Sequence, residues 1–239
     1  MNSNQAPKFI TFEGTEGVGK TTAMTGFCQK LKDNGIDFIC TREPGGSVLA
    51  ENLREILLDN KTAISDDTEL LLMFTARADH LHRTILPALS QGKWVVCDRF
   101  VDSTVAYQGF GRYDGASEGL AKIERLVADF VPRLPDITFW LDLNPAIGLE
   151  RAGRRSVADR FENAGEAFFD KTYQGFLYQY QNNAKRIQRI NANQSPSCVL
   201  ADILRAVYLD QTSSLGQTNC SIGTCDGLGA MSNHHTSNI

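Results

Sequence analysis

The sequence predicts an α/β protein with a central parallel five-stranded sheet flanked by helices. Apolar runs of strand length alternate with longer segments of helical periodicity, the order that produces a parallel sheet. The run Trp-Val-Val-Cys-Asp at 94–98 is nearly all apolar, as expected for a strand buried on both faces. Strands are expected at 8–12, 36–41, 94–98, 136–143 and 186–192. Helices are expected at 22–34, 47–59, 67–90, 120–130, 168–185 and 195–209, with another starting at 144 and a glycine-rich connection at 109–119.

The composition limits the function classes. At 239 residues the chain is long enough for one sizeable domain, and no apolar run approaches the length of a membrane span. The first eight residues hold no apolar core segment, so we expect a cytoplasmic and not a secreted protein. A net charge of -4 argues against nucleic acid as the main partner. The six cysteines are expected to be mostly buried, reduced thiols.

The first motif follows the first expected strand directly. Gly14, Gly19, Lys20 and Thr21 have the spacing G-x-x-x-x-G-K-[ST] of a phosphate-binding loop. The glycines leave backbone N–H groups free to surround a phosphate, Lys20 can reach the terminal phosphates, and the Thr21 hydroxyl can hold Mg²⁺. The loop predicts binding of a nucleoside triphosphate by Gly14, Thr15, Glu16, Gly17, Val18, Gly19, Lys20, Thr21 and Thr22.

Two further clusters follow expected strands. The hexapeptide 42–47, Arg-Glu-Pro-Gly-Gly-Ser, lies where open parallel sheets bind ligands, although alone it is also typical of a plain turn. Asp98 ends the strand 94–98 in the place of a metal-binding acid, and if the next stretch is helical, Arg99, Ser103 and Tyr107 share one face. Arg77 lies in an apolar helix, either as an edge residue or as an anion ligand.

Near the C-terminal end of the fold, four arginines occur within residues 151–160. Such a charge run is either a solvated face or a mobile segment that closes over phosphates. The composition then changes at 211 to Ser, Thr, Asn and Gly, so we expect one domain over 1–210 and a disordered tail over 211–239. A zinc site in the tail, at Cys220, Cys225, His234 and His235, does not have a standard spacing.

Together these stretches resemble the thymidylate kinases, over Phe9 to about Leu209. The specific part is the combination of FEGTEGVGKTT at 12–22, REPGGS at 42–47, DRFVDSTVAYQG at 98–109 and DRFE at 159–162. The resemblance implies a P-loop NTPase of the nucleoside monophosphate kinase fold, with a lid at about 150–162. It also implies a homodimer that phosphorylates dTMP to dTDP with ATP and Mg²⁺.

The resemblance further implies a role for each motif residue. Lys20 would act on ATP with the loop amides, and Thr21 and Asp98 would hold the metal. Arg54 and Arg99 would grip the dTMP phosphate. The other acceptor-side roles would be Phe74 stacking on thymine, Arg77 at the base, Ser103 and Gln108 near its polar edge, Tyr107 against the sugar, Glu16 near the 3′-hydroxyl and Glu43 orienting the acceptor side.

The family has two forms that differ in the source of the arginine that stabilises the transition state. One form carries it in the phosphate loop after the acid, and the other in the lid. Here Gly17 follows Glu16, so we expect the lid-arginine form typical of bacteria, with Arg155 as the first candidate and Arg151 as the second.

Three alternatives stay open at this point. The chain could be a kinase for another monophosphate or for a deoxynucleoside, a nucleotide-binding switch, or an inactive paralogue that only binds. A guanine-nucleotide switch would be expected to carry the motif Asn-Lys-x-Asp. The sequence does not contain it, since Asn60-Lys61 is followed by Thr62-Ala63.

Overall fold

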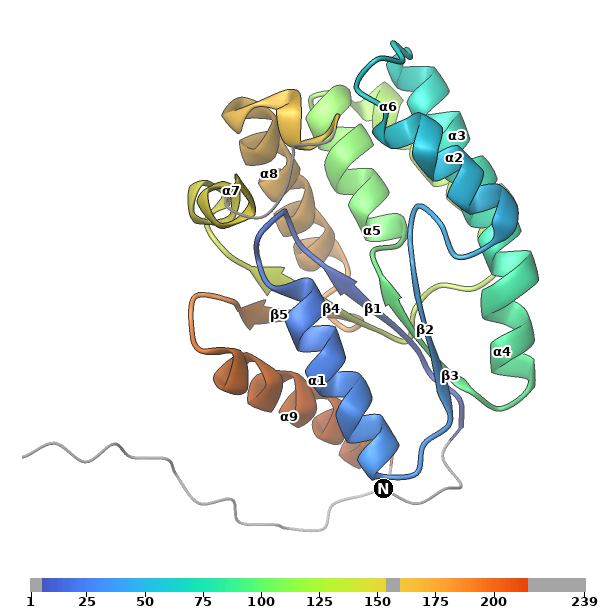
Figure 1. Cartoon of the computed structure of the whole chain (residues 1–239), viewed down its shortest axis with the longest axis vertical. Coiled ribbons are helices and arrows are strands. Elements are labelled where there is room, and N and C mark those ends of the chain that lie inside the picture. Colours follow the sequence, from blue (N-terminus) through green and yellow to red (C-terminus); the bar gives the residue numbers. More distant parts are fainter. Residues whose placement is uncertain (1–5, 154–159, 215–239) are drawn as a thin grey trace, which may run out of the picture.

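The computed structural model describes residues 6–153 and 160–214, apart from the side chains of Glu162 and 208–214. It contains a five-stranded parallel sheet in the order β2-β3-β1-β4-β5 (Figure 1), which confirms the predicted fold class. The strands are β1 (Phe9–Glu13), β2 (Phe38–Arg42), β3 (Trp94–Asp98), β4 (Ile137–Asp142) and β5 (Ile187–Asn191).

The register brings the polar strand ends together at one edge of the sheet. Asp98 pairs with Phe12 on one side and with Arg42 on the other, and Glu13 pairs with Trp140. This is the edge at which parallel sheets bind ligands, because the loops after several strands meet there.

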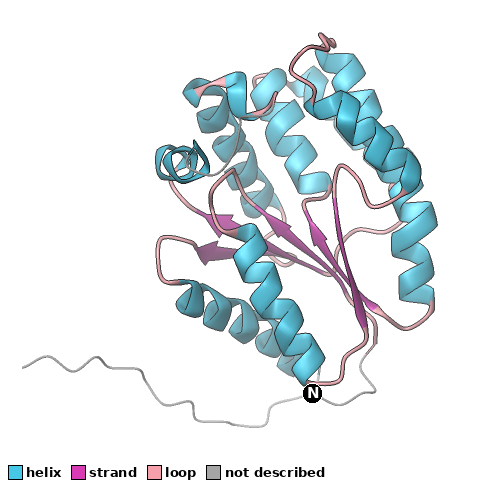
Figure 2. Cartoon of the chain, viewed as in Figure 1, coloured by secondary structure: helices cyan, strands magenta, loops and turns pink. Residues whose placement is uncertain are grey.

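Two helices cover one face of the sheet (Figures 1 and 2). Helix α1 (Lys20–Asp33) packs with α9 (Pro196–Ser214) over the apolar side chains of the central strands. Helix α9 continues to Ser214, four residues beyond the boundary expected at 210. The rest of the expected tail, with the cysteines and histidines of the considered zinc site, lies outside the described residues.

The other helices lie across the opposite face and at the carboxyl edge of the sheet (Figure 1). They are α2 (Val48–Leu58), α3 (Asp66–His80), η1 (Leu81–Ile85), α4 (Leu86–Ser90), α5 (Val101–Thr104), η2 (Val105–Arg112), α6 (Ser117–Phe130), α7 (Pro145–Gly153), η3 (Glu162–Ala164) and α8 (Glu166–Asn182).

The helices differ from the expectation in two places. The helix expected at 67–90 is continuous but contains a π-helical stretch, η1. The glycine-rich connection expected at 109–119 is wrong in its first part, since η2 continues to Arg112. The glycine at 111 permits close packing there, because a Cβ on it would lie 2.5 Å from the Phe168 ring.

The cysteines only partly follow the expectation. The four in the described part of the chain are free, but Cys40 and Cys198 are exposed. Cys40 is exposed because β2 is an edge strand of the sheet. Among the described helices, none is long and apolar enough to cross a bilayer.

Candidate active site

The phosphate loop connects β1 to α1 and is folded onto its own lysine. Lys20 Nζ donates hydrogen bonds to the carbonyl oxygens of Gly14 (3.0 Å) and Thr15 (2.9 Å). Burial, and secondarily the positive charge of Arg99, lowers the Lys20 pKa to about 8. The loop and the start of α1 thus form an anion site whose lysine pairs with loop carbonyls in this conformation.

A close contact that the sequence does not reveal explains why position 17 holds a glycine. Its φ is 70°, and a Cβ on it would lie 1.9 Å from the carbonyl oxygen of Gly148 in α7. Any side chain at position 17 would therefore require α7 to move, and an arginine does not fit there.

The same contact brings α7 over the phosphate loop. Arg151, one turn after Gly148, lines what we call the loop cavity, together with Gly17, Val18, Gly19, Thr22, Ala23, Ala192, Gln194, Pro196 and Val199. Sequence reasoning missed the members from 192 to 199, although a loop after a parallel strand is a place to expect ligand contacts. Arg155 lies outside the described residues.

Arg99 connects the loop to a second cavity. It follows β3 with φ 68°, a left-handed conformation that is rare for a residue with a side chain and is often found at functional sites. Its guanidinium donates to Gly14 O (2.9 Å), Ser103 Oγ (3.1 Å) and Glu16 Oε1 (2.8 Å). It also lies 4.8 Å from the centre of the Tyr107 ring, and the Tyr107 hydroxyl donates to Glu16. Arg99, Ser103 and Tyr107 therefore meet as expected, but not on one helix face, because Arg99 precedes α5 and its side chain is turned toward the helix by the left-handed backbone.

The second cavity, which we call the arginine cavity, has about 540 Å³ of empty volume. It contains all the predicted acceptor residues except Phe74. Its lining is Glu16, Glu43, Pro44, Arg54, Leu58, Met73, Arg77, Arg99, Phe100, Ser103, Thr104, Tyr107, Gln108 and Phe161. Of these, Pro44, Leu58, Met73, Phe100, Thr104 and Phe161 were not predicted. Phe161 could have been noticed as the aromatic residue of the DRFE motif.

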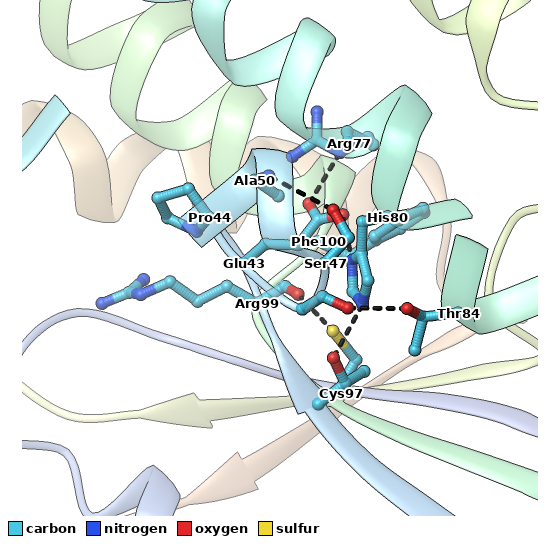
Figure 3. A network of polar contacts seen from close by, with 12 residues as sticks. Glu43, Pro44, Ser47, Ala50, Arg77, His80, Thr84, Cys97, Arg99 and Phe100 are labelled. Carbon is cyan, nitrogen blue, oxygen red and sulfur yellow. Dashed lines mark hydrogen bonds and ion pairs between the residues drawn. The ribbon is translucent and has the colours of Figure 1, made fainter. Parts of the chain in front are cut away.

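Glu43 is the centre of a buried polar cluster beneath this cavity (Figure 3). It is 5% exposed and accepts from Arg77 Nε (2.7 Å), and its other oxygen pairs with His80 Nδ1 (3.0 Å). His80 Nε2 in turn lies 2.7 Å from Thr41 Oγ1. Gly46 passes so close to the His80 ring that a Cβ would lie 2.3 Å from Nε2. The segment 42–47 is therefore not a plain turn, and Arg77 is a buried partner of Glu43 and not an edge residue.

Two polar atoms of cavity residues have no hydrogen-bond partner in the part of the chain that the structure describes. One is a donor, Arg77 Nη1, and the other an acceptor, Gln108 Oε1. The amide nitrogen of Gln108 donates to Glu69 Oε1 at 2.7 Å, so the oxygen is the atom left for a ligand. Buried polar groups are rarely left unsatisfied, and such a pair is expected where a bound molecule completes the bonding.

Phe74 is not among the residues that line the arginine cavity. It is 3% exposed, belongs to the core beneath the cavity, and has the Arg77 guanidinium 5.0 Å from its ring centre. Because Phe74 and Arg77 are three residues apart on α3, they stack on one helix face. The aromatic walls of the cavity are Phe100, Tyr107 and Phe161.

The two predicted metal residues, Thr21 and Asp98, line one surface cavity beside α1. Asp98 Oδ1 is buried and lacks a hydrogen-bond partner within the described residues. A hydroxyl with a carboxylate is a donor set that Mg²⁺ accepts, usually with water and phosphate oxygens in addition. The residues present therefore fit this ion.

Glu13 is a site residue that the sequence reasoning missed. It is fully buried and accepts from Phe100 N (2.8 Å), Ser103 N (3.3 Å) and Ser103 Oγ (2.5 Å), so it holds the start of α5. Burial, with a smaller contribution from the neighbouring Asp102 carboxylate, raises the Glu13 pKa to about 8. Its position as the last residue of the first strand, directly before the phosphate loop, was the available signal.

Arg99 and Glu16 line the arginine cavity and also reach the phosphate loop, because Arg99 donates to Gly14 O and Glu16 precedes Gly17. The phosphate loop offers anions its backbone amides and Lys20, and the arginine cavity offers them Arg54, Arg77 and Arg99. The arrangement can hold two phosphate-bearing molecules with positive charge between them, as transfer of a phosphoryl group requires.

Comparison with known proteins gives one consistent family. A family model described as thymidylate kinase matches residues 12–203. The chain is 65% identical over 185 residues to a thymidylate kinase of Psychrobacter sp. (strain PRwf-1), covering 77% of this chain and 89% of that protein. It is 48% identical over 202 residues to a thymidylate kinase of Teredinibacter turnerae (strain ATCC 39867 / T7901), covering 84% and 97%.

A solved structure agrees with this result. The crystal structure of thymidylate kinase from Ehrlichia chaffeensis aligns with a TM-score of 0.69 at 30% sequence identity, covering 85% of this chain and 100% of that chain.

Proposed function

The chain belongs to the thymidylate kinase family and phosphorylates dTMP to dTDP with ATP, and on this premise we propose how its two cavities divide the work. The arginine cavity receives dTMP and the loop cavity receives ATP. The observation that carries the proposal is the unsatisfied pair of Arg77 Nη1 and Gln108 Oε1 in one cavity.

This pair matches the edge of thymine. The base presents an acceptor, O4, beside a donor, N3–H, and the residues that line the cavity have one unpartnered donor and one unpartnered acceptor to meet them. Cytosine presents the reverse order, an amine beside an unprotonated nitrogen, and would leave the protein groups unpaired. Unpaired buried groups are strongly selective, so the pair favours dTMP over dCMP.

The remaining acceptor residues receive the sugar and phosphate. Arg54 and Arg99 bind the dTMP phosphate, since both line the cavity and guanidinium groups fit phosphate oxygens well. Tyr107, held by Glu16, lies against the sugar where a ribose 2′-hydroxyl would clash, and Glu16 is near the 3′-hydroxyl. Ser103 lies near the polar edge of the base. Glu43 positions Arg77, because its carboxylate accepts the hydrogen bond of Arg77 Nε and leaves Nη1 for the base.

Phe74 enters the proposal in a changed role. The cation–π contact at 5.0 Å supports the Arg77 guanidinium from below. Stacking of Phe74 on thymine, as the family resemblance implied, stays a prediction, and the ring is not among the residues that line the cavity.

For ATP, we propose that Lys20 leaves the loop carbonyls and binds the β- and γ-phosphates. The catalytic arginine comes from the lid, because α7 packs on Gly17 and leaves no room for one in the loop. Arg151 lines the loop cavity, which supports its part in this role. Arg155 remains the first candidate for the transition state from the sequence alone.

Thr21 and Asp98 would hold Mg²⁺ with ATP, as the unpartnered Asp98 oxygen supports. When bound, this ion supplies positive charge that neutralises the phosphates. A phosphate oxygen of dTMP attacks the γ-phosphorus in line, and the bond from that phosphorus to the β–γ bridging oxygen breaks, which releases ADP. The attacking oxygen is already anionic, so no strong base is required. Lys20, Arg99 and the lid arginines stabilise the spreading charge.

We also propose a homodimer. Exposed apolar side chains lie on the adjacent helices α2 and α3, where Leu49 is 46%, Ile56 43% and Leu71 55% exposed. Such a face is typical of an interface. Light scattering after size-exclusion chromatography should show a dimer, and Leu71→Glu should shift it to monomer. The expected cytoplasmic location stays a prediction.

The acceptor assignment is tested by coupled ADP-release assays with MgATP across dTMP, dUMP, dCMP, UMP, CMP, AMP, GMP and 3-methyl-dTMP. Turnover should be highest with dTMP. Methylation at N3 should reduce turnover sharply, because it replaces the N3–H group whose hydrogen bond Gln108 Oε1 accepts. Efficient use of 3-methyl-dTMP or dCMP would contradict the assignment. The same panel tests the rival readings, since a switch or an inactive paralogue would turn over none of these acceptors.

A further inference from the structure

Glu69 is a buried acid next to the acceptor site that no motif singled out. It lies in the first turn of α3 and is 1% exposed. It does not line the arginine cavity itself. A carboxylate so deeply buried requires several strong donors around it.

Three side chains from two other segments supply these donors. Gln108 Nε2 donates to Oε1 at 2.7 Å. Arg160 Nη1 donates to Oε2 at 2.7 Å, and Arg112 Nη2 lies 3.1 Å from the same oxygen. Arg112 Nε donates more weakly to both oxygens, at 3.2 Å from Oε2 and 3.3 Å from Oε1. Toward two guanidinium groups and an amide N–H, the Glu69 carboxylate oxygens act only as hydrogen-bond acceptors.

The Glu69 carboxylate restricts the orientation of the Gln108 side-chain amide. An amide side chain can present either its oxygen or its nitrogen to a partner, and the two arrangements have nearly the same shape. Facing a pure acceptor, Gln108 must turn its nitrogen to Glu69 and keep its oxygen for the cavity, where that oxygen is unpartnered among the described residues.

We propose that Glu69 is a positioning residue for acceptor specificity: it fixes the amide orientation of Gln108 and so makes the site select a base with N–H at position 3. The inference rests on the proposed function, since it requires Gln108 to read the base edge. Glu69 touches no substrate in this account and acts through Gln108.

The isosteric change Glu69→Gln tests this directly. Arg112 and Arg160 can only donate and their shortest contacts fall on Oε2, so the new amide turns its oxygen to that side and its nitrogen to Gln108, giving up only the 3.3 Å contact of Arg112 Nε. Gln108 then inverts and offers N–H to the cavity, which clashes with thymine N3–H and suits cytosine N3. The ratio of kcat/KM for dTMP to that for dCMP should fall at least about tenfold.

This ratio is independent of how much of the variant folds, because both substrates are measured on the same sample. Asp67→Asn is the matched control. It makes the same charge change in the same turn of α3, but Asp67 pairs with Lys122 and Tyr113 at the surface. Its ratio should equal that of the wild type.

Exchanging the two side chains provides a rescue. In Glu69→Gln combined with Gln108→Glu, the amide nitrogen at 69 donates to the carboxylate at 108, whose second oxygen again accepts from N3–H. The double variant should regain most of the lost discrimination, which a merely structural role for Glu69 does not predict.

Gln108→Ala distinguishes a failure of the Glu69 inference from a failure of the proposed base contact. If it lowers the dTMP-to-dCMP ratio while Glu69→Gln stays within about twofold of the wild type, the inference is overturned and the proposed function stands. If Gln108→Ala leaves the ratio unchanged, Gln108 does not read the base, and both fail.

Discussion

The two cavities of this enzyme are prepared to different degrees. At the arginine cavity, Glu43 and Glu69 bind the side chains of Arg77 and Gln108, and His80 in turn binds Glu43. Arg77 Nη1 and Gln108 Oε1 are unpaired within the described residues, and we propose that they meet the base. In the phosphate loop, Lys20 is bonded to the carbonyls of Gly14 and Thr15 and must exchange them for phosphate. The difference suggests that dTMP meets a rigid site, while ATP binding reorganises the loop.

The largest effect is expected on the ATP side of this comparison. Arg155→Ala should lower kcat by roughly 10³-fold or more, because an arginine that neutralises the transferred group contributes about that much. ATP should still bind, as fluorescence titration with a labelled nucleotide would show. Arg151→Ala, measured in parallel, decides between the two arginines, and unchanged turnover in both variants would contradict the lid assignment.

On the dTMP side the expected effect is smaller and falls on binding. Arg77→Ala removes the donor to the base and leaves Glu43 buried without its guanidinium, so KM for dTMP should rise roughly 100-fold, in line with about 2–3 kcal/mol. Steady-state kinetics should show little change in KM for ATP. Arg83→Ala serves as the control, since Arg83 lies on the same helical run but is exposed and pairs only weakly with Asp79. An equal rise in both KM values would mean that the cavities are not separate.

A substitution of Glu13 tests whether the stability provided by this buried acid depends on pH. Its pKa, about 8 in the folded protein against 4.5 ordinarily, means that the folded state holds the proton more tightly. Its contribution to stability is therefore present at low pH and is lost as the pH rises from about 4.5 through 8. Glu13→Gln mimics the protonated acid and should gain stability relative to the wild type over this range, by up to about 4–5 kcal/mol at pH 8.5.

Thermal unfolding measured from pH 5 to pH 8.5 would show this as a difference in Tm that grows with pH. The control is Glu118→Gln, which changes an exposed acid in the first turn of α6. Parallel Tm profiles for wild type and Glu13→Gln would refute the raised pKa.

The smallest effect concerns Lys20 itself. With its pKa at about 8, roughly half of the Lys20 side chains are neutral at pH 8, and ATP phosphates should draw a proton onto them. Calorimetric titration in buffers of different ionisation enthalpy should give an uptake of about half a proton at pH 8 and almost none at pH 6.5. The measurement is best made in Glu13→Gln, so that Glu13 does not contribute. No uptake with ATP at pH 8 would mean that the loop is already charged and prepared.

The sequence by itself determined the fold class and the phosphate loop, which follow from local patterns: apolar runs of strand length and a motif whose spacing places glycines and lysine after the first strand. The acceptor residues were expected because the motifs resemble those of the thymidylate kinases. The absence of an arginine at position 17 could also be read directly from the motif.

Only the tertiary structure decided how those residues are held. Contacts such as Glu69 with Gln108, or Gly17 with Gly148, join segments 39 and 131 residues apart, and no local pattern encodes them. Phe74 shows the same limit, since helical spacing puts it on the face of Arg77 but does not say which of the two reaches the cavity. Burial sets the remaining properties, because the pKa values of Glu13 and Lys20 depend on the removal of water by parts of the chain that are distant in the sequence.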